Sequence, residues 1–136
     1  MNIKFKAIVL AAMLISITNA NAGTILSPTA ALASSEFSSD YSINNTIDQS
    51  GLSSGFVSGV TDFDTYLATN PTHNLLAFHN EWFTPEGVHS AQVDYNLGAI
   101  YNIDRLALWN EEFSGLSAFN ILISSDNVNF ISLLPT

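Results

Sequence analysis

Apolar and polar residues alternate along several short stretches in the second half of the chain. The clearest is residues 91–97, where Ala, Val, Tyr and Leu alternate with Gln, Asp and Asn. Residues 105–109 and 119–123 repeat this period, and turn-forming residues 125–127 lead into a fourth apolar stretch at 130–134. Because strand side chains point alternately to opposite faces, the period predicts half-buried strands joined by short turns. The pattern favours an all-β fold, an antiparallel β-sandwich.

The first half of the chain differs, because Ser, Asn, Asp, Thr and Gly crowd residues 34–65. These residue types favour turns, since their side chains bond to nearby backbone and Gly tolerates positive φ. We therefore expect loops there and no convincing helix anywhere. A length of 136 residues, without a tandem repeat, indicates one domain.

The start of the chain has the three parts of an export signal. Two lysines in the first six residues precede an apolar run at residues 7–15, and Ala20-Asn21-Ala22 matches an A-x-A cleavage site. A membrane anchor is the alternative, but it needs about 20 unbroken apolar residues, and polar residues end this run earlier. We expect a signal peptide over residues 1–22, cleavage near Ala22, and a secreted or cell-surface protein of residues 23–136.

Charge narrows the class of partner. Once the signal is removed, twelve acids face a single Arg105 and no Lys, a net charge of −11. A chain with so few cations cannot neutralise phosphates, which excludes nucleic-acid binding, and an anionic lipid membrane would repel it. The absence of cysteine excludes disulfides, thiol catalysis and Cys-ligated metals.

A series of motifs carries a resemblance to a known family. In chain order these are Asn45-Thr46-Ile47-Asp48, Trp82, Val93-Asp94-Tyr95-Asn96-Leu97-Gly98, Ile103-Asp104-Arg105-Leu106-Ala107-Leu108-Trp109, and the stretch from Phe119 to Phe130. Together they resemble the discoidin domain, also called the coagulation factor V/VIII type C domain, over roughly residues 30–134. The resemblance implies the galactose-binding-like jelly roll and a non-catalytic binding module. With its export signal and acidic, Ser/Asn-rich body, the chain is also similar to exported bacterial surface proteins.

The chain departs from the family pattern at several points. Gln49 stands where a Gly usually follows Asp48, and Asn96 stands where Asp usually precedes Leu-Gly. The stretch between Asp48 and Trp82 is longer than usual, which predicts an extended loop or an extra hairpin. The family continues for two or three strands beyond Phe130, so the resemblance implies a domain truncated at its C-terminus, with its last strands missing and sheet edges left unpaired.

Two polar and aromatic clusters are candidates for binding a glycan or cell-surface polysaccharide. Sugar-binding modules place an aromatic side chain against the C–H face of a pyranose ring, beside Asn, His or carboxylate hydrogen-bond partners. The candidates are His79, Asn80, Glu81 and Trp82 in one cluster and Trp109, Asn110 and Glu111, followed by Glu112, in the other. Core packing of either tryptophan is the alternative.

The resemblance also implies one structural Ca²⁺ in the loop that follows the Asn45 motif. The family's ligand offsets fall on Asp48, Ser50 and Ser53, and oxygen ligands of this kind suit Ca²⁺. A further family ligand, an acidic residue near the C-terminus of the domain, has no counterpart in the chain. A solvated turn capped by Asp48 is the alternative. Asp62 and Asp64 resemble another cation-binding pair, although alternate strand residues or surface acids explain them equally.

Enzyme motifs are incomplete. Gly51-Leu52-Ser53-Ser54-Gly55 matches G-x-S-x-G, but the strand and helix that flank a nucleophile elbow are not expected there. His73, His79 and His89 have spacings that fit no familiar zinc signature. We therefore expect a carbohydrate-binding module without enzymatic activity. The alternative is a structural or adhesive surface protein that lacks a defined sugar pocket.

Overall fold

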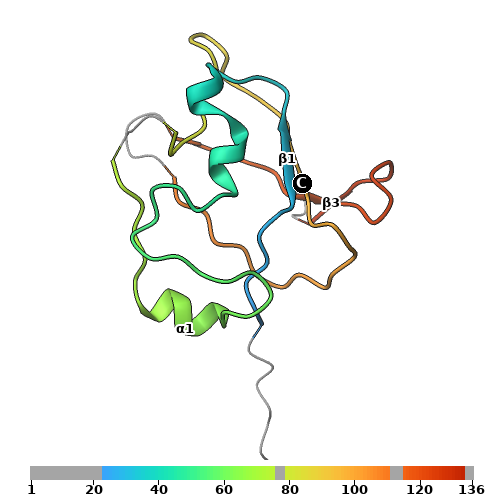
Figure 1. Ribbon diagram of the computed structural model, residues 1–136. Coiled ribbons are helices and arrows are strands. Elements are labelled where there is room, and N and C mark those ends of the chain that lie inside the picture. Colours follow the sequence, from blue (N-terminus) through green and yellow to red (C-terminus); the bar gives the residue numbers. More distant parts are fainter. Residues whose placement is uncertain (1–22, 76–78, 111–114, 134–136) are drawn as a thin grey trace, which may run out of the picture.

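The computed structural model describes residues 23–75, 79–110 and 115–133. Its elements are β1 (Ala30–Ala33), η1 (Ser39–Tyr41), η2 (Ile43–Thr46), α1 (Phe63–Ala68), β2 (Val93–Asn96), β3 (Leu122–Ile123) and β4 (Ile131–Ser132). The strands form two small antiparallel sheets, β1–β2 and β3–β4, and most of the remaining chain is coil. Figure 1 shows the 3₁₀ helices η1 and η2 toward one end of the molecule and α1 toward the opposite end. The strand pairing is antiparallel, as expected, and the two small sheets are compatible with a β-rich fold.

The β1–β2 sheet joins the two halves of the chain. The strands pair from Ala30 opposite Asn96 to Ala33 opposite Val93, and a backbone hydrogen bond continues the pairing beyond each end. β2 lies within the predicted stretch 91–97, so the two-residue period located this strand correctly. β1 was not predicted, because its sequence of three alanines and one leucine carries no polar alternation.

β3 and β4 form a hairpin around the predicted turn, which Asp126 organises. The Asp126 carboxylate accepts hydrogen bonds from the N–H groups of Asn129 (2.8 Å) and Val128 (2.9 Å), from Asn129 Nδ2 (2.7 Å) and from the Ser124 hydroxyl (2.9 Å). These donors, those of Asn129 above all, hold the pKa of Asp126 well below its ordinary value of 3.8. The turn therefore depends on an ionised carboxylate.

We expect the Asp126 turn to persist under acidic conditions in which an ordinary aspartate is already protonated. Because the folded pKa is depressed, the turn stabilises the hairpin fully above the unfolded pKa of about 3.9 and loses that contribution only as pH falls through the lower folded pKa. In an NMR titration, the chemical shifts of the Val128 and Asn129 amide protons should change only at a pH well below 3.8, the ordinary pKa of aspartate. Asp126→Asn should abolish this pH-dependent change. A midpoint at the ordinary value of 3.8 would contradict the prediction.

The expectation that the chain has no helix is wrong at Phe63–Ala68. Asp62 caps this helix, because its Oδ1 accepts the Thr65 N–H at 2.7 Å. Asp64 lies in the first turn, where a negative charge interacts favourably with the helix dipole. The structure thus gives both acids a local role in starting α1. A helix of six residues is too short to display a recognisable 3.6-residue period.

Residues 105–109 also differ from the prediction, since they form no regular strand in the described part of the chain. Leu106 and Leu108 are 63% and 51% exposed, whereas Ala107 and Trp109 are half-buried. The Trp109 indole is anchored by a hydrogen bond from its Nε1 to the Pro71 carbonyl (3.0 Å). The Trp109 ring therefore points toward the protein interior, and the side chains of Leu106 and Leu108 face solvent.

Two side chains on helices are the most deeply buried hydrophobic residues described. Ile43 of η2 is 2% exposed and Tyr66 of α1 is 5% exposed. Ile43 N–H donates to Glu36 Oε1 (2.7 Å), and the Tyr66 hydroxyl donates to the Ser54 carbonyl (2.7 Å). The unpredicted helices thus supply the best-packed positions. No helix within the described residues has the length and apolar character needed to cross a bilayer.

Candidate functional site

The first predicted cluster, which begins at His79, lies against η1. His79 N–H donates to the Asp40 carbonyl (2.8 Å), and His79 Nε2 lies 3.6 Å from Asp40 Oδ1. Both side chains are accessible, with 70% of the His79 side chain and 47% of the Asp40 side chain exposed. A ligand in solvent can therefore reach this Asp40–His79 pair.

Asn45 holds together the two backbone segments that carry Asp40 and His79. Its Nδ2 donates to the Asp40 carbonyl (3.0 Å) and to the Glu81 carbonyl (2.9 Å). One half-buried amide thus joins η1, η2 and the segment that carries His79. The sequence identified Asn45 as part of a motif, but nothing in its spacing indicated a bond to a residue 36 positions away.

An aromatic cluster, made of Phe37, Tyr41 and Phe83, lies in the same region. Phe37 N–H donates to the Phe83 carbonyl (2.7 Å), which aligns the two segments. The Tyr41 ring packs edge-on against both phenylalanines, with centroids 5.8 Å from Phe37 and 5.4 Å from Phe83. Phe37 is 57% exposed, so part of its ring is available to a ligand. Nothing in the sequence indicated this cluster, because Phe83 lies more than forty residues from Phe37 and Tyr41 along the chain.

Trp82 and Asn80, two other members of the first cluster, are held by hydrogen bonds within the protein. Trp82 is half-buried, and its Nε1 donates to the Ser35 carbonyl (3.1 Å). Asn80 is also half-buried, with its carbonyl 3.1 Å from His73 Nε2. Trp82 therefore anchors its segment through the indole N–H. The exposed aromatic ring of this region is that of Phe37, which packs against Tyr41, the residue that follows Asp40.

The second predicted cluster lies against different segments. The half-buried Trp109 is anchored on Pro71, as described above. Asn110 binds Leu116 twice, donating from Nδ2 to the Leu116 carbonyl (3.0 Å) and accepting the Leu116 N–H at Oδ1 (2.7 Å). Glu111 lies outside the described residues. The described hydrogen bonds of Trp109 and Asn110 therefore go to the backbone of Pro71 and Leu116, and not to residues of the first predicted cluster.

The predicted calcium ligands belong to a hydrogen-bonded loop. Asp48 Oδ1 accepts the Ser50 N–H (2.8 Å), His73 Nε2 lies 3.1 Å from the Ser50 carbonyl, and Ser53 Oγ accepts the Thr72 N–H (2.9 Å). Each predicted ligand thus already has a partner within the protein. Among the described residues, no three or more His, Asp or Glu side chains are grouped so as to hold a metal ion. The calcium site stays a prediction.

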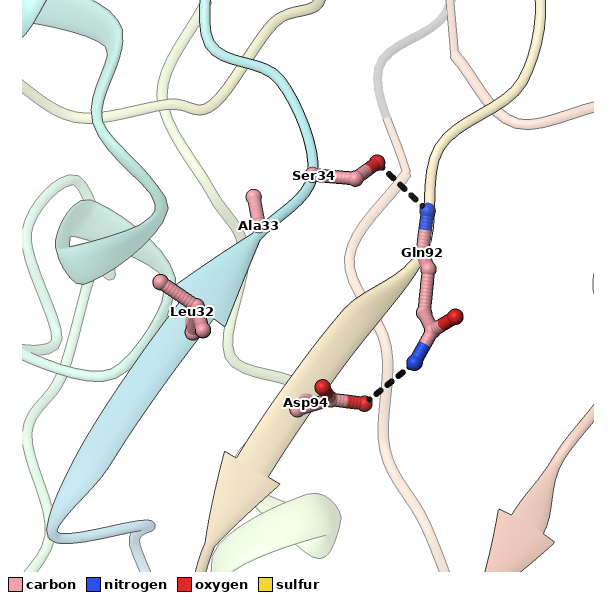
Figure 2. Close-up of a pocket in the computed structure, with 5 residues that line it drawn as sticks. All are labelled: Leu32, Ala33, Ser34, Gln92 and Asp94. Atoms are coloured by element: carbon pink, nitrogen blue, oxygen red, sulfur yellow. Dashed lines mark hydrogen bonds between the residues drawn. The ribbon is translucent and has the colours of Figure 1, made fainter.

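An open pocket lies elsewhere, beside β1 and β2, and is lined by Leu32, Ala33, Ser34, Gln92 and Asp94. Figure 2 shows its polar groups bonded to one another. Ser34 Oγ accepts the Gln92 N–H, and Gln92 Nε2 donates to Asp94 Oδ1, both at 3.0 Å. Because this lining contains no aromatic ring, the aromatic cluster and the Asp40–His79 pair form the better candidate for binding a sugar.

Comparison of the chain with protein-family models, with curated proteins and with solved structures finds no match.

Proposed function

We propose that the chain is a secreted, non-catalytic carbohydrate-binding module with a discoidin-like β-sandwich fold. The observation that carries this proposal is the exposed Phe37 ring, which packs against Tyr41, in the same region as the exposed Asp40–His79 pair. The two small antiparallel sheets are compatible with a sandwich, and the expected signal peptide accounts for secretion.

Each part of the site supplies one component of sugar recognition. The face of an aromatic ring packs against the C–H groups of a pyranose. A carboxylate accepts hydrogen bonds from sugar hydroxyls, and an imidazole can donate one and accept another. The net charge of −11 on residues 23–136 disfavours glycans that carry carboxylate or sulfate groups. A neutral glycan is therefore the favoured ligand.

We expect Phe37→Ala to weaken glycan binding by roughly 30-fold, because truncation of a central aromatic contact costs about 2 kcal/mol. A glycan array probed with the full chain, expressed in an exporting host, would identify the glycan, and titration would give the affinities. Asp40→Asn keeps the shape of the side chain and should weaken binding by about tenfold through loss of a charged acceptor.

Phe119→Ala is the matched control, since Phe119 is 50% exposed and lies outside the aromatic cluster. This variant should bind the glycan as tightly as the wild type does. Undiminished binding by Phe37→Ala, or an equal loss in Phe119→Ala, would place the site elsewhere. A wild-type protein that circular dichroism shows to be folded, yet that binds no glycan on the array, would rule out the proposed function.

Exposed apolar residues favour the second candidate function, a structural or adhesive surface protein. Extensive exposed apolar surface marks contacts with other proteins. Among the described residues in the last third of the chain, the exposed large apolar ones are Ile100, Tyr101, Ile103, Leu106, Leu108, Leu116, Phe119, Leu122, Ile123, Val128, Phe130, Ile131 and Leu133. Adhesion that a competing monosaccharide fails to inhibit would favour this function over sugar binding.

A further inference from the structure

The open pocket beside β1 and β2 brings apolar and polar side chains together on one face of the first sheet. Leu32 and Asp94 are cross-strand partners, and Ser34 pairs with Gln92 just beyond the ends of the two strands. Because cross-strand partners and residues two apart on a strand point to the same side, these four side chains share a face. Together with Ala33 they border a volume of about 280 Å³ (Figure 2). Sites for drug-sized molecules occupy roughly 300–1,000 Å³, so this pocket suits a smaller group.

Asp94 places an unbalanced negative charge in the pocket. The residue is half-buried, and Gln92 Nε2 donates to its Oδ1 at 3.0 Å. Residues 23–136 contain one arginine and no lysine, and that arginine, Arg105, pairs with Asp64 and Asp104 instead. Within the part of the chain that the structure describes, no cationic side chain pairs with Asp94. A partly desolvated carboxylate without a counter-ion favours a cation that comes from outside the chain.

The apolar side of the pocket narrows the kind of cation. Leu32 is 69% exposed, although it lies directly opposite Asp94, and Ala33 adds a second apolar side chain to the lining. A calcium or magnesium ion needs about six oxygen ligands around it, which an apolar wall does not supply. A hydrocarbon chain laid along Leu32 would instead remove apolar surface from water on both partners. The pocket therefore matches a cation that is attached to an alkyl chain.

The hydrogen bond from Gln92 distinguishes between the two common organic cations. Gln92 Nε2 already donates to Asp94 Oδ1, whereas Oδ2 accepts no hydrogen bond from the described residues. A guanidinium binds a carboxylate best through both oxygens at once, while an ammonium is a compact charge that a single oxygen can accept. The occupied Oδ1 therefore favours an ammonium group.

We propose that this pocket binds a primary alkylammonium group, with the ammonium on Asp94 Oδ2 and the alkyl chain along Leu32. A lysine side chain of a partner protein and a free small amine share this chemistry. The pocket has no residue in common with the proposed glycan site, so the inference goes beyond the proposed function and does not depend on it.

Titration of the isotope-labelled full chain, expressed in an exporting host, with n-butylammonium chloride would test the site by NMR. We expect saturable shifts of the Gln92 side-chain amide and of the Asp94 backbone N–H. Neither n-butanol, which has the chain without the charge, nor potassium chloride, which has the charge without the chain, should reproduce them. Methylammonium should bind at least about fourfold more weakly than n-butylammonium, because each methylene that leaves water strengthens binding by roughly that factor.

Asp94→Asn preserves the shape of the side chain and should weaken n-butylammonium binding by at least about tenfold, through loss of the charged acceptor. Glu86→Gln is the matched control, since it removes the same charge from an exposed residue outside the pocket lining. This variant should bind n-butylammonium as tightly as the wild type does. An equal loss in both variants would show that only the overall negative charge attracts the amine, and would overturn the site.

The remaining outcomes are equally decisive. Absence of saturable shifts with n-butylammonium, or the same shifts with n-butanol, overturns the proposal, and this comparison on the wild type decides alone if Asp94→Asn fails to fold. Tighter binding of n-butylguanidinium than of n-butylammonium overturns the choice of ammonium. A lysine-containing peptide with blocked ends separates the two sources: shifts at the same residues support a lysine of a partner protein, and binding of n-butylammonium alone supports a free amine.

Discussion

Replacement of Gly51 by alanine is expected to lower the free energy of unfolding by roughly 3 kcal/mol. About 1 kcal/mol arises because Gly51 has φ of 77°, a conformation that L-residues with a side chain rarely adopt. The rest arises from crowding, since a Cβ would lie 2.3 Å from Asn74 Oδ1 and 2.6 Å from His73 Nε2. His73 cannot retreat without leaving the carbonyls of Ser50 and Asn80. Urea unfolding followed by circular dichroism would measure the loss.

Gly59→Ala separates the two causes. Gly59 has a closely similar φ of 75°, but an added Cβ would meet no atom within 4 Å. Its replacement should therefore cost about 1 kcal/mol, from backbone conformation alone. Equal losses for the two variants would show that the contact of Gly51 with His73 and Asn74 is not tight, which would contradict the prediction.

Tyr66→Ala should lower the free energy of unfolding by about 4 kcal/mol, because it empties one of the two most deeply buried hydrophobic positions that the structure describes. The ring packs edge-on against Phe56, with centroids 5.4 Å apart, and the hydroxyl donates to the Ser54 carbonyl. Tyr66→Phe retains the ring contact and should cost about 1 kcal/mol, the contribution of the hydrogen bond. The same urea titrations would measure both variants.

Tyr101→Ala is the matched control for the burial of Tyr66. Tyr101 is 46% exposed, and its truncation should change the free energy of unfolding by no more than about 0.5 kcal/mol. A loss as large as that of Tyr66→Ala would mean that the last third of the chain contributes as much packing as α1 does.

An element was predictable from the sequence when the residues that stabilise it lie within or next to it. The β3–β4 hairpin was predictable because the Asp126 turn lies between its strands, and β2 was predictable from its own alternation. The helix α1 depends on one cap at Asp62, and β1 depends on a partner far along the chain, so neither has a period to detect. Residues 105–109 alternate as a strand does, but they form no regular strand. The hydrogen bond of Trp109 to Pro71 holds the indole on the inner side, and the leucines face outward.

The candidate site was predictable only in part, for a similar reason. The residue types near His79 indicated polar chemistry, yet its partner Asp40 lies in η1, about forty residues earlier, and the exposed Phe37 ring packs against Tyr41 of the same 3₁₀ helix. Gln49 is another example, because it stands where the pattern of the discoidin domain, which the sequence resembles, has glycine, and it adopts φ of 67°. Its side-chain amide accepts the Phe56 N–H (2.8 Å) and donates to the Phe56 carbonyl (3.1 Å). The sequence marked Gln49 as a departure from the pattern that the chain resembles, but it indicated neither the positive φ nor these two hydrogen bonds.

The register of the first sheet has a consequence for how the chain is made. β1 and β2 are separated by about 60 residues, since Ala33 pairs with Val93. Ribosomes add about 5–20 residues per second, so the residues of β1 are synthesised roughly 3–12 seconds before those of β2. The β3–β4 hairpin, by contrast, closes over a short turn on a timescale of about microseconds. The nascent protein therefore cannot complete its first sheet for several seconds, and through that interval the backbone groups of β1 have no strand partner.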